Sequence, residues 1–330
     1  MKFSSPVLVT GASGFVGSHL AEKLAQNGVK VNLLVRKTSK IPFKVGPQIH
    51  LCYGDVTDRD SVVKAAQGVK VIYHLAGILR GSSFIKLNEV NAEGTRNVCE
   101  AALKVKGLKR LVYVSSLSAA GPSRDGKPLK ENLPCQPVSL YGVTKFKGEE
   151  LAQAYGKRLP LTILRPGAVY GPRETDIFAY FKMVKDGWVL LPSLKQEVSF
   201  VHVQDLVNAI LLAGHSPKAV GQVYFVSDGI PYSWQELTRE IGKATSRSFR
   251  TIPIPMGVVR IVAYAGELAE KISGKASMLN VDKVKEAFYT HWTCDNGKIR
   301  AQLGFKPQWN LEKGVRDAAS FYQQEGWIKG

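Results

Sequence analysis

The sequence predicts an α/β fold: a doubly wound parallel sheet of about seven strands, followed by a smaller mixed α/β lobe. Three observations predict this fold. Up to residue 170, short and nearly continuous apolar runs alternate with segments of helical periodicity, which is typical of parallel strands covered by helices on both faces. A glycine-rich turn follows the first apolar run. Beyond residue 170 the alternation loosens, which indicates a second architecture.

The first half is predicted to form a Rossmann-type domain over residues 1–170. Val16, Leu20 and Leu24 recur at helical spacing and so share one face of a first helix. The expected strands are 7–9, 31–35, 51–53, 69–75, 111–115 and 161–164. The expected helices are 14–26, 91–104 and 140–155.

The second half is predicted to form a substrate-binding lobe over residues 171–330, with some of the chain crossing back to the Rossmann sheet. Ligands of open α/β sheets lie at the carboxyl ends of the strands, and we expect the lobe to cover that edge. We interpret most of the apolar stretch 252–268 as a helix that packs on the core or lines a site. The expected helices are 177–185, 205–213, 233–244, 255–272 and 311–324, with short strands near 223–225 and 251–252.

Length and composition suit a globular protein. The chain has 330 residues, of which 45% are hydrophobic and 22% are charged, and both fractions are ordinary. No apolar run reaches the roughly 18 residues that span a bilayer. The four cysteines are far apart and lack metal-ligand spacing, so we expect reduced thiols and no metal. Few residues precede the first strand, and we therefore expect no signal peptide and a cytoplasmic location.

The net charge of +18 is unevenly distributed. Residues 1–170 carry a net charge of +14, and the remainder carries +4. A basic first half attracts anionic ligands such as a dinucleotide, although nucleic acid or an anionic membrane surface would favour the same bias. Because no basic run exceeds two residues and no nucleic-acid motif occurs, we expect no nucleic-acid partner. Peripheral membrane contact stays open.

The glycine-rich turn predicts a dinucleotide cradle. Its glycines are spaced Gly-x-x-Gly-x-x-Gly between the first strand and the first helix. Glycine allows the backbone to approach a pyrophosphate closely, and a helix N-terminus favours negative charge. The expected cofactor contacts in this turn are Gly11, Ser13, Gly14, Phe15, Val16 and Gly17.

The end of the second strand bears on the choice of cofactor. NAD-binding enzymes usually place an acidic residue there for the ribose hydroxyls, whereas an arginine accommodates a 2′-phosphate. Here Arg36 and Lys37 follow Val35, and no acid is present. We therefore favour NADP(H), with NAD(H) as the alternative. In that alternative Arg36 stacks on adenine or faces solvent.

The ends of the third and fourth strands supply further candidate cofactor contacts. An aspartate at position 55 can accept a hydrogen bond from the adenine amino group, or it caps the helix that begins near residue 58. Small residues after the fourth strand let a dinucleotide pass close to the backbone. His74 is expected to be a packed histidine rather than a catalyst. The expected contacts are Asp55, Val56, Leu75, Ala76 and Gly77.

Tyr141 and Lys145 predict a proton-transfer device. They are four residues apart on a predicted helix and therefore share a face. A free tyrosine has a pKa of about 10, so it is a poor base at neutral pH. A nearby ammonium and a cationic nicotinamide favour the phenolate and lower that pKa. Lys145 can also bind the cofactor ribose, and Ser116, at the end of the fifth strand, can hydrogen-bond a substrate oxygen.

Together these motifs resemble the extended short-chain dehydrogenase/reductases, also called the NAD-dependent epimerase/dehydratase family. The resemblance implies a seven-stranded Rossmann sheet, a C-terminal substrate lobe and the catalytic set Ser116, Tyr141 and Lys145. It also implies that the backbone at Pro166 and Gly167 contacts the nicotinamide. The matching stretches are 10–17, 54–56, 74–77, 91–95, 115–116, 141–145, 165–172 and 201–205, where Asn91 would position a helix.

Two departures from the family narrow the reaction. Sugar-nucleotide 4,6-dehydratases carry an Asp-Glu pair after the catalytic hydroxyl, where this chain has Leu117 and Ser118. Sugar-nucleotide epimerases usually show Arg-Asp-Phe where this chain has Val-Ser-Phe at 198–200. Losing the arginine that clamps a diphosphate counts against a nucleotide sugar. Arg173 remains a candidate for an anion.

Two further stretches resemble particular branches of the family. Residues 116–122 are similar to the 3β-hydroxysteroid dehydrogenase-like branch, and residues 35–36 are similar to the NADPH-using dihydroflavonol-reductase-like branch. The second half also offers apolar side chains that would line a pocket or belong to the core. They are Phe178, Tyr180, Phe181, Trp188, Val258, Ile261, Val262 and Tyr264.

These features favour an NADP(H)-preferring oxidoreductase acting on a secondary alcohol or ketone of an apolar or mixed small molecule. One alternative is a nucleotide-sugar epimerase that uses the same residues and retains NAD. A second is a non-catalytic cofactor-binding protein attached to an assembly or membrane, although the intact Ser116, Tyr141 and Lys145 argue against it. The resemblance further implies a homodimer formed through the helices at 91–104 and 140–155.

Overall fold

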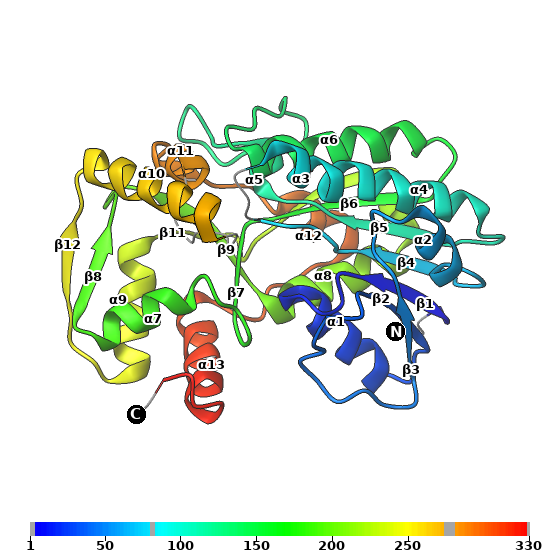
Figure 1. Cartoon of the computed structure of the whole chain (residues 1–330), viewed down its shortest axis with the longest axis horizontal. Helices are drawn as coiled ribbons and strands as arrows, with labels where there is room; N and C mark the ends of the chain where they lie inside the picture. The colour runs from blue at the N-terminus through cyan, green and yellow to red at the C-terminus, as the bar shows by residue number, and fades with distance from the viewer. Residues whose placement is uncertain (1–3, 80–82, 274–280, 329–330) are drawn as a thin grey trace.

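Seven parallel strands form the central sheet of the protein (Figure 1). The computed structural model describes residues 4–79, 83–273 and 281–328. The strand order is β10-β6-β5-β4-β1-β2-β3, so the chain starts in the middle and winds outward in both directions. The strands are β1 (Val7–Thr10), β2 (Val31–Val35), β3 (Ile49–Tyr53), β4 (Val71–His74), β5 (Arg110–Val114), β6 (Leu161–Pro166) and β10 (Gln222–Val226).

Helices cover both faces of this sheet because its strands are apolar on both sides. In β1, Val7 and Val9 pack with one layer of helices, whereas Leu8 packs with the opposite layer. The first layer contains α1 (Phe15–Gln26), α8 (Val203–His215) and α12 (Gly297–Leu303). The opposite layer contains α2 (Arg59–Ala65), α4 (Gly94–Lys104) and α6 (Leu140–Tyr155). Short turns of helix connect them: α3 (Phe84–Asn88), η1 (Glu89–Glu93), α5 (Leu117–Ala120) and η2 (Pro217–Ala219).

The lobe lies at one side of the sheet domain and has its own apolar core (Figure 1). In one small sheet β9 pairs with β7, β11 and β13, and in another β8 pairs with β12. The lobe strands are β7 (Ala168–Tyr170), β8 (Trp188–Leu191), β9 (Glu197–His202), β11 (Pro231–Ser233), β12 (Arg250–Pro253) and β13 (His291–Trp292). Its helices are α7 (Phe178–Lys185), α9 (Trp234–Thr245), α10 (Met256–Ser273), α11 (Val281–Ala287) and α13 (Leu311–Gln324).

The seven-stranded parallel sheet is confirmed, but part of the second half belongs to it. The strand expected near 223–225 was placed in the lobe; it is β10, the edge strand of the large sheet. The helix expected at 205–213 is α8, which packs beneath that sheet with α1. These segments are buried by long-range packing that helical periodicity does not reveal. The division of the chain at residue 170 stays a prediction.

The apolar residues singled out in the second half separate into two groups. Phe178 and Phe181 are buried in the lobe core, and Tyr180 stacks on Trp234 with ring centroids 4.9 Å apart. The other residues are exposed: Trp188, Val258, Ile261, Val262 and Tyr264. This second group is therefore neither core nor the lining of a closed pocket. No helix in the described part of the chain is long and apolar enough to cross a membrane.

Candidate active site

The glycine turn is shaped by two close backbone approaches. Gly11 has a φ of +71°, and a Cβ there would lie 2.7 Å from the backbone nitrogen of Ala76. A Cβ at Gly17 would lie 2.2 Å from the carbonyl oxygen of Gly11. Both contacts are too short for any side chain. The turn therefore brings the N-terminus of α1 against the carboxyl ends of β1 and β4, as the glycine spacing predicts.

The N-terminus of α1 is free to receive an anion. Gly14 is its N-cap and has no side chain to accept a hydrogen bond from the first turn. That turn contains no acidic residue, so its backbone N–H groups and the helix dipole favour a bound phosphate. A cavity of about 390 Å³ opens beside the turn. Its lining residues are Ser13, Gly14, Phe15, Ser18, Pro42, Arg173, Phe321, Glu325 and Trp327.

Arg173 adds a cation to the cavity at the glycine turn. It lies far away in the sequence but donates hydrogen bonds to Glu22 Oε2 at 2.8 Å and to Ser18 Oγ at 3.4 Å. Its φ of +72° is unusual for a residue other than glycine. From the sequence, Arg173 is a candidate contact for an anion, but its position beside the glycine turn could not be predicted. A helix N-terminus, a cavity and a cation together fit the pyrophosphate of a dinucleotide.

The residues expected at the adenine end surround the ends of β2 and β3. Arg36 and Lys37 are exposed directly after β2. Asp55 Oδ1 accepts hydrogen bonds from the backbone N–H and the hydroxyl of Thr57. The alternative that Asp55 caps the next helix is wrong, because Asp58 caps α2 instead. Val56 is buried against α4, so any contact from it to adenine stays a prediction.

The end of β4 is fixed by a buried histidine. His74 Nδ1 lies 2.8 Å from Thr10 Oγ1, and His74 Nε2 lies 3.0 Å from Thr95 Oγ1. Burial, helped by the charge of Lys145, lowers the pKa of His74 to about 3. The neutral ring therefore ties β1, β4 and α4 together, as expected of a packed histidine. Thr10 Oγ1 also accepts a hydrogen bond from the N–H of Ala76, which orients the stretch from Leu75 to Gly77.

Ser116 and Tyr141 come from elements that touch. Ser116 is the N-cap of α5, and its Oγ accepts a hydrogen bond from Ser118 N at 3.1 Å. Tyr141 is the second residue of α6 and is partly buried. Next to it, a Cβ at Gly142 would lie 2.4 Å from the carbonyl oxygen of Ser118. The close packing of α5 on α6 thus brings Ser116 and Tyr141 to one edge of the sheet.

Lys145 lies buried between the ends of β4 and β5. Its Nζ donates a 2.9 Å hydrogen bond to the carbonyl oxygen of Val114 and lies 4.4 Å from the ring centroid of Tyr113. A Cβ at Gly77 would lie 3.8 Å from the same Nζ. Burial lowers the pKa of Lys145 to about 7, while the charge of Glu149 opposes that shift. The amine is therefore held where the cofactor cradle and α6 meet.

A buried ion pair supports this arrangement. Glu149, one helical turn beyond Lys145 on α6, accepts hydrogen bonds from Arg165 of β6 at 3.0 Å. Both side chains are almost fully buried. Pro166 and Gly167 follow Arg165 at the carboxyl end of β6, where Gly167 N donates to Val226 O and a Cβ would lie 2.2 Å from Ser199 O. The contact of this backbone with a nicotinamide stays a prediction.

The lobe contributes two carboxylates to the start of α6, and sequence analysis missed both. The carboxylate of Asp282, on α11, accepts hydrogen bonds from Leu140 N at 2.6 Å and Tyr141 N at 3.2 Å. Glu286 accepts a 2.7 Å hydrogen bond from Ser139, which in turn caps Gly142 N. Negative charge at a helix N-terminus is stabilising. The lobe thereby holds the backbone of the residue expected to transfer the proton.

Asn91 performs a positioning role, in agreement with the resemblance. It lies in η1, where its Oδ1 accepts from Ile78 N at 2.9 Å and its Nδ2 donates to Ile78 O at 3.0 Å. The same Nδ2 donates to Thr144 of α6 at 3.1 Å. Asn91 therefore connects the loop after β4 with the helix that carries Tyr141 and Lys145.

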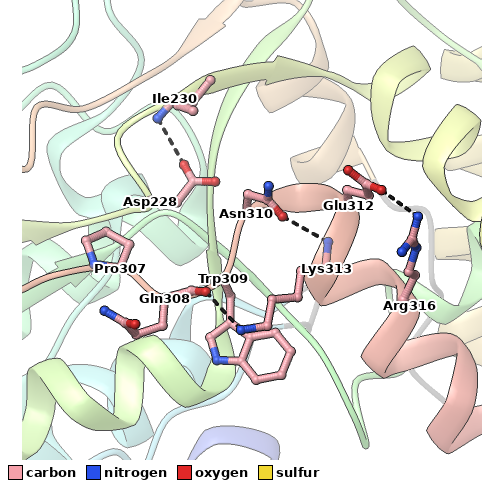
Figure 2. Close-up of a pocket in the computed structure, with 9 residues that line it drawn as sticks. All are labelled: Asp228, Ile230, Pro307, Gln308, Trp309, Asn310, Glu312, Lys313 and Arg316. Atoms are coloured by element: carbon pink, nitrogen blue, oxygen red, sulfur yellow. Dashed lines mark hydrogen bonds and ion pairs between the residues drawn. The ribbon is translucent and has the colours of Figure 1, made fainter.

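A second cavity, of about 450 Å³, lies between the end of β10 and the start of α13 (Figure 2). Burial raises the pKa of Asp228, on one wall, to about 6. On the other wall Lys313 donates to Gln308 O and lies over the Trp309 ring (Figure 2). None of the residues expected in catalysis or cofactor binding lines this cavity. Among the described residues, no cluster of three histidine, cysteine or acidic side chains could hold a metal ion.

The fold and the site define an NAD(P)-dependent enzyme of the extended short-chain dehydrogenase/reductase type. A model of the NAD dependent epimerase/dehydratase family matches residues 7–227, which include the glycine turn, Ser116, Tyr141 and Lys145. The chain belongs to that family.

The chain is also similar over nearly its whole length to three individual proteins. The chain is 28% identical over 327 residues to a ceramide reductase of Caulobacter vibrioides, covering 98% of this chain and 96% of that protein. It is 28% identical over 337 residues to a 3-beta-hydroxysteroid dehydrogenase of Mycolicibacterium neoaurum, covering 96% and 91%. The structure of MoeE5 in complex with UDP-glucose and NAD matches with a TM-score of 0.78 and 25% identity, covering 97% of this chain and 99% of that one.

Proposed function

We propose that the protein is a reductase or dehydrogenase that uses a dissociable nicotinamide cofactor, NADP(H) in preference to NAD(H), on a secondary alcohol or ketone. The observation that carries the nicotinamide-dependent chemistry in this proposal is the position of Lys145. Its buried amine lies between the ends of β4 and β5, on the same helix face as Tyr141. This arrangement suits an amine that binds a ribose and promotes proton transfer by a neighbouring phenol.

Each residue of the proposed set has a defined task. A bound nicotinamide would supply or accept the hydride, which leaves proton transfer and orientation to the protein. Tyr141 gives its hydroxyl proton to the substrate oxygen in reduction and takes it back in oxidation. Ser116 Oγ already accepts a hydrogen bond from Ser118 N, so its own hydroxyl hydrogen is available to the substrate oxygen. Asp282 fixes the backbone of Tyr141.

The NADP(H) preference is supported by the end of β2. Arg36 and Lys37 are exposed there, where an acidic residue would bind the ribose hydroxyls of NAD(H). Changing Arg36→Asp should lower the NADPH-to-NADH preference ratio by about tenfold or more, the equivalent of one charge-assisted hydrogen bond. Lys40→Asp, at another exposed basic position nearby, is the matched control. An unchanged ratio in Arg36→Asp removes Arg36 from the cofactor site.

The substrate class is supported by two of the similar proteins, whose names describe redox chemistry on a ceramide and on a steroid. We propose an apolar or mixed small molecule on that basis. The test is a screen of ketones and aldehydes with the purified protein, followed through the nicotinamide absorbance. Oxidation of stoichiometric NADPH in the presence of a ketone supports the proposal.

A nucleotide-sugar epimerase with retained NAD is the second candidate. It is supported by the family itself and by the complex of MoeE5 with UDP-glucose and NAD. Against it, the triplet 198–200 lies in β9 and is fully buried, and Ser199 Oγ accepts a hydrogen bond from Cys294 N. No arginine clamps a diphosphate at that triplet. Epimerisation of a sugar nucleotide without net consumption of cofactor would favour this candidate.

A cytoplasmic homodimer is also part of the proposal. The four cysteines are free, which suits a reducing compartment, and dimerisation through α4 and α6 is typical of the family. Light scattering during gel filtration measures the mass directly. A mass of one chain at micromolar concentration would contradict the dimer.

A further inference from the structure

In the part of α10 whose side chains are described, up to residue 266, most of the exposed side chains are apolar, where a surface helix normally carries polar residues. Ile261 is 70% exposed and Tyr264 is 59% exposed, and Val258 and Val262 are exposed on the same side. The opposite side of the helix is already satisfied, because Val259 and Ala263 are buried against Val284 of α11. The exposed apolar side is therefore left over after the lobe has packed.

The small sheet next to α10 repeats this property. In β8, Val189 and Leu191 are buried in the lobe core, whereas Trp188 and Leu190 are exposed. The register places Ile252 of β12 opposite Leu190, and Ile252 is exposed as well. β12 leads directly into α10 at the left of Figure 1. We call the exposed set Trp188, Leu190, Ile252, Val258, Ile261 and Val262 the apolar face of the lobe.

Positive charge borders this face. Between Glu240, which pairs with Lys243, and Glu267 the sequence contains four basic residues and no acidic one. Two of them lie over aromatic rings: the Arg250 guanidinium is 5.9 Å from the centroid of Trp188, and that of Arg260 is 5.4 Å from the centroid of Phe288. Trp188 and Phe288 are both about half exposed. Apolar and aromatic side chains bordered by arginines are typical of surfaces that insert shallowly into anionic lipid.

We propose that the apolar face of the lobe docks on an anionic lipid bilayer, with α10 lying in the plane of the interface. A second copy of the chain is a poorer occupant. A two-fold interface would bring the same arginines together, in a chain whose net charge is +18. Anionic headgroups neutralise those arginines while the acyl boundary covers the apolar side chains.

The docked helix would lie one helix away from the catalytic tyrosine. α10 packs on α11 through Val259, Ala263 and Val284, and Asp282 of α11 holds the backbone of Tyr141. Docking would therefore place the proposed site beside the membrane, where a lipid substrate is concentrated. Docking itself stands without the proposed function; only the use of lipid substrates rests on it.

Flotation of the full-length protein with vesicles tests the proposal. Wild type should float with vesicles of phosphatidylcholine and phosphatidylglycerol, less so at high salt, and weakly with phosphatidylcholine alone. Ile261→Glu should lower the apparent affinity for the mixed vesicles by about tenfold or more, because it places a carboxylate against the headgroups. Val220→Glu, at an exposed apolar residue away from α10, β8 and β12, should bind like wild type.

Two further measurements keep the outcome clear. Because Ile261 is exposed, Ile261→Glu should leave the melting temperature and NADPH affinity unchanged, so lost flotation is not lost folding. Absence of wild-type flotation, or equal flotation of Ile261→Glu, overturns the proposal. A dimer in solution that Ile261→Glu dissociates, without vesicle binding, would instead assign this face to a second copy. None of these readouts uses turnover, so failure here is separate from failure of the proposed oxidoreduction.

Discussion

The sheet domain and the lobe differ in how much apolar surface they leave exposed. In β5 every residue is buried, and the strands of the sheet interior have apolar residues packed on both faces. In the lobe, β8 and the first half of α10 bury one side and expose several apolar side chains on the other. Helices cover the apolar faces of the sheet domain, whereas the lobe keeps apolar side chains exposed to solvent, where another molecule could bind. We therefore expect the first region to bind the cofactor and the second to bind the molecule on which the cofactor acts.

The same contrast applies to the site. Most of the residues expected to bind the cofactor lie at or just beyond the ends of neighbouring strands. The lobe contacts the candidate site through individual side chains that are distant in sequence, such as Asp282 with Tyr141 and Arg173 with Glu22. Loss of a sheet-domain residue should therefore remove function, and loss of a lobe residue should only reduce it.

The largest expected effect is on the tyrosine. Tyr141→Phe removes the proposed proton donor and should lower kcat by about 10²–10⁴-fold. The NADPH Kd should stay within about threefold, since one phenol hydroxyl contributes little to a large ligand. The matched control is Tyr155→Phe at the other end of α6, where the hydroxyl meets only Glu100. Unchanged turnover in Tyr141→Phe would contradict proton transfer by this tyrosine.

The glycine turn gives the next effect. Gly17→Ala would place a Cβ 2.2 Å from Gly11 O, so the turn must shift and the helix N-terminus must move away from a phosphate. We expect NADPH affinity to fall by about tenfold or more in a fluorescence titration. Gly46→Ala is the control, because nothing lies within 4 Å of a Cβ there. Equal affinities for the two variants would contradict the assignment of the turn.

The lobe should contribute less. Asp282→Asn removes the negative charge from the N-terminus of α6 and should lower kcat by about fivefold, the value of roughly 1 kcal/mol at a helix cap. The NADPH Kd should not change, because the hydrogen bonds of this carboxylate among the described residues go to the start of α6. Asp295→Asn removes a similar cap from Gly297 N elsewhere. If both variants have the same kcat, Asp282 has no positioning role.

The last effect is on stability rather than on activity, and it is measured without cofactor. Burial lowers the pKa of Lys145 from 10.5 to about 7, so the unfolded chain binds more protons between these values. Through this group, the free energy of unfolding of the wild-type protein therefore rises as the pH increases from about 7 to 10.5. Lys145→Met removes that dependence, and its stability relative to wild type should be greatest near pH 6 and decline toward pH 10. The measurement is urea unfolding of both proteins at both pH values. The same difference in free energy of unfolding at pH 6 and pH 10 would contradict the lowered pKa of Lys145.

Sequence alone could predict the sheet and the glycine turn, and the role of Ser116, Tyr141 and Lys145 as a catalytic set stays a prediction. Each depends on local periodicity or on residues that follow a strand end, where parallel topology gathers side chains at one edge. The expected catalytic residues indeed lie at that edge, with Lys145 Nζ bound to the last carbonyl of β5.

Long-range contacts could not be predicted. Nothing near Asp282 indicates that its carboxylate meets Leu140 and Tyr141. The edge strand β10 was misplaced because an apolar run does not say which sheet it joins. The apolar stretch that became α10 was expected to pack or to line a site, and its exposed side appears only once the lobe is assembled.

If this protein exchanges a nicotinamide cofactor with solution, a titration of the purified protein should show it. After the purified protein has been checked for retained nucleotide, NADPH and NADH are added while nicotinamide fluorescence is followed. We expect no retained nucleotide and reversible binding, with NADPH the tighter ligand. Tightly held NAD that survives purification would contradict it and direct the substrate search to sugar nucleotides.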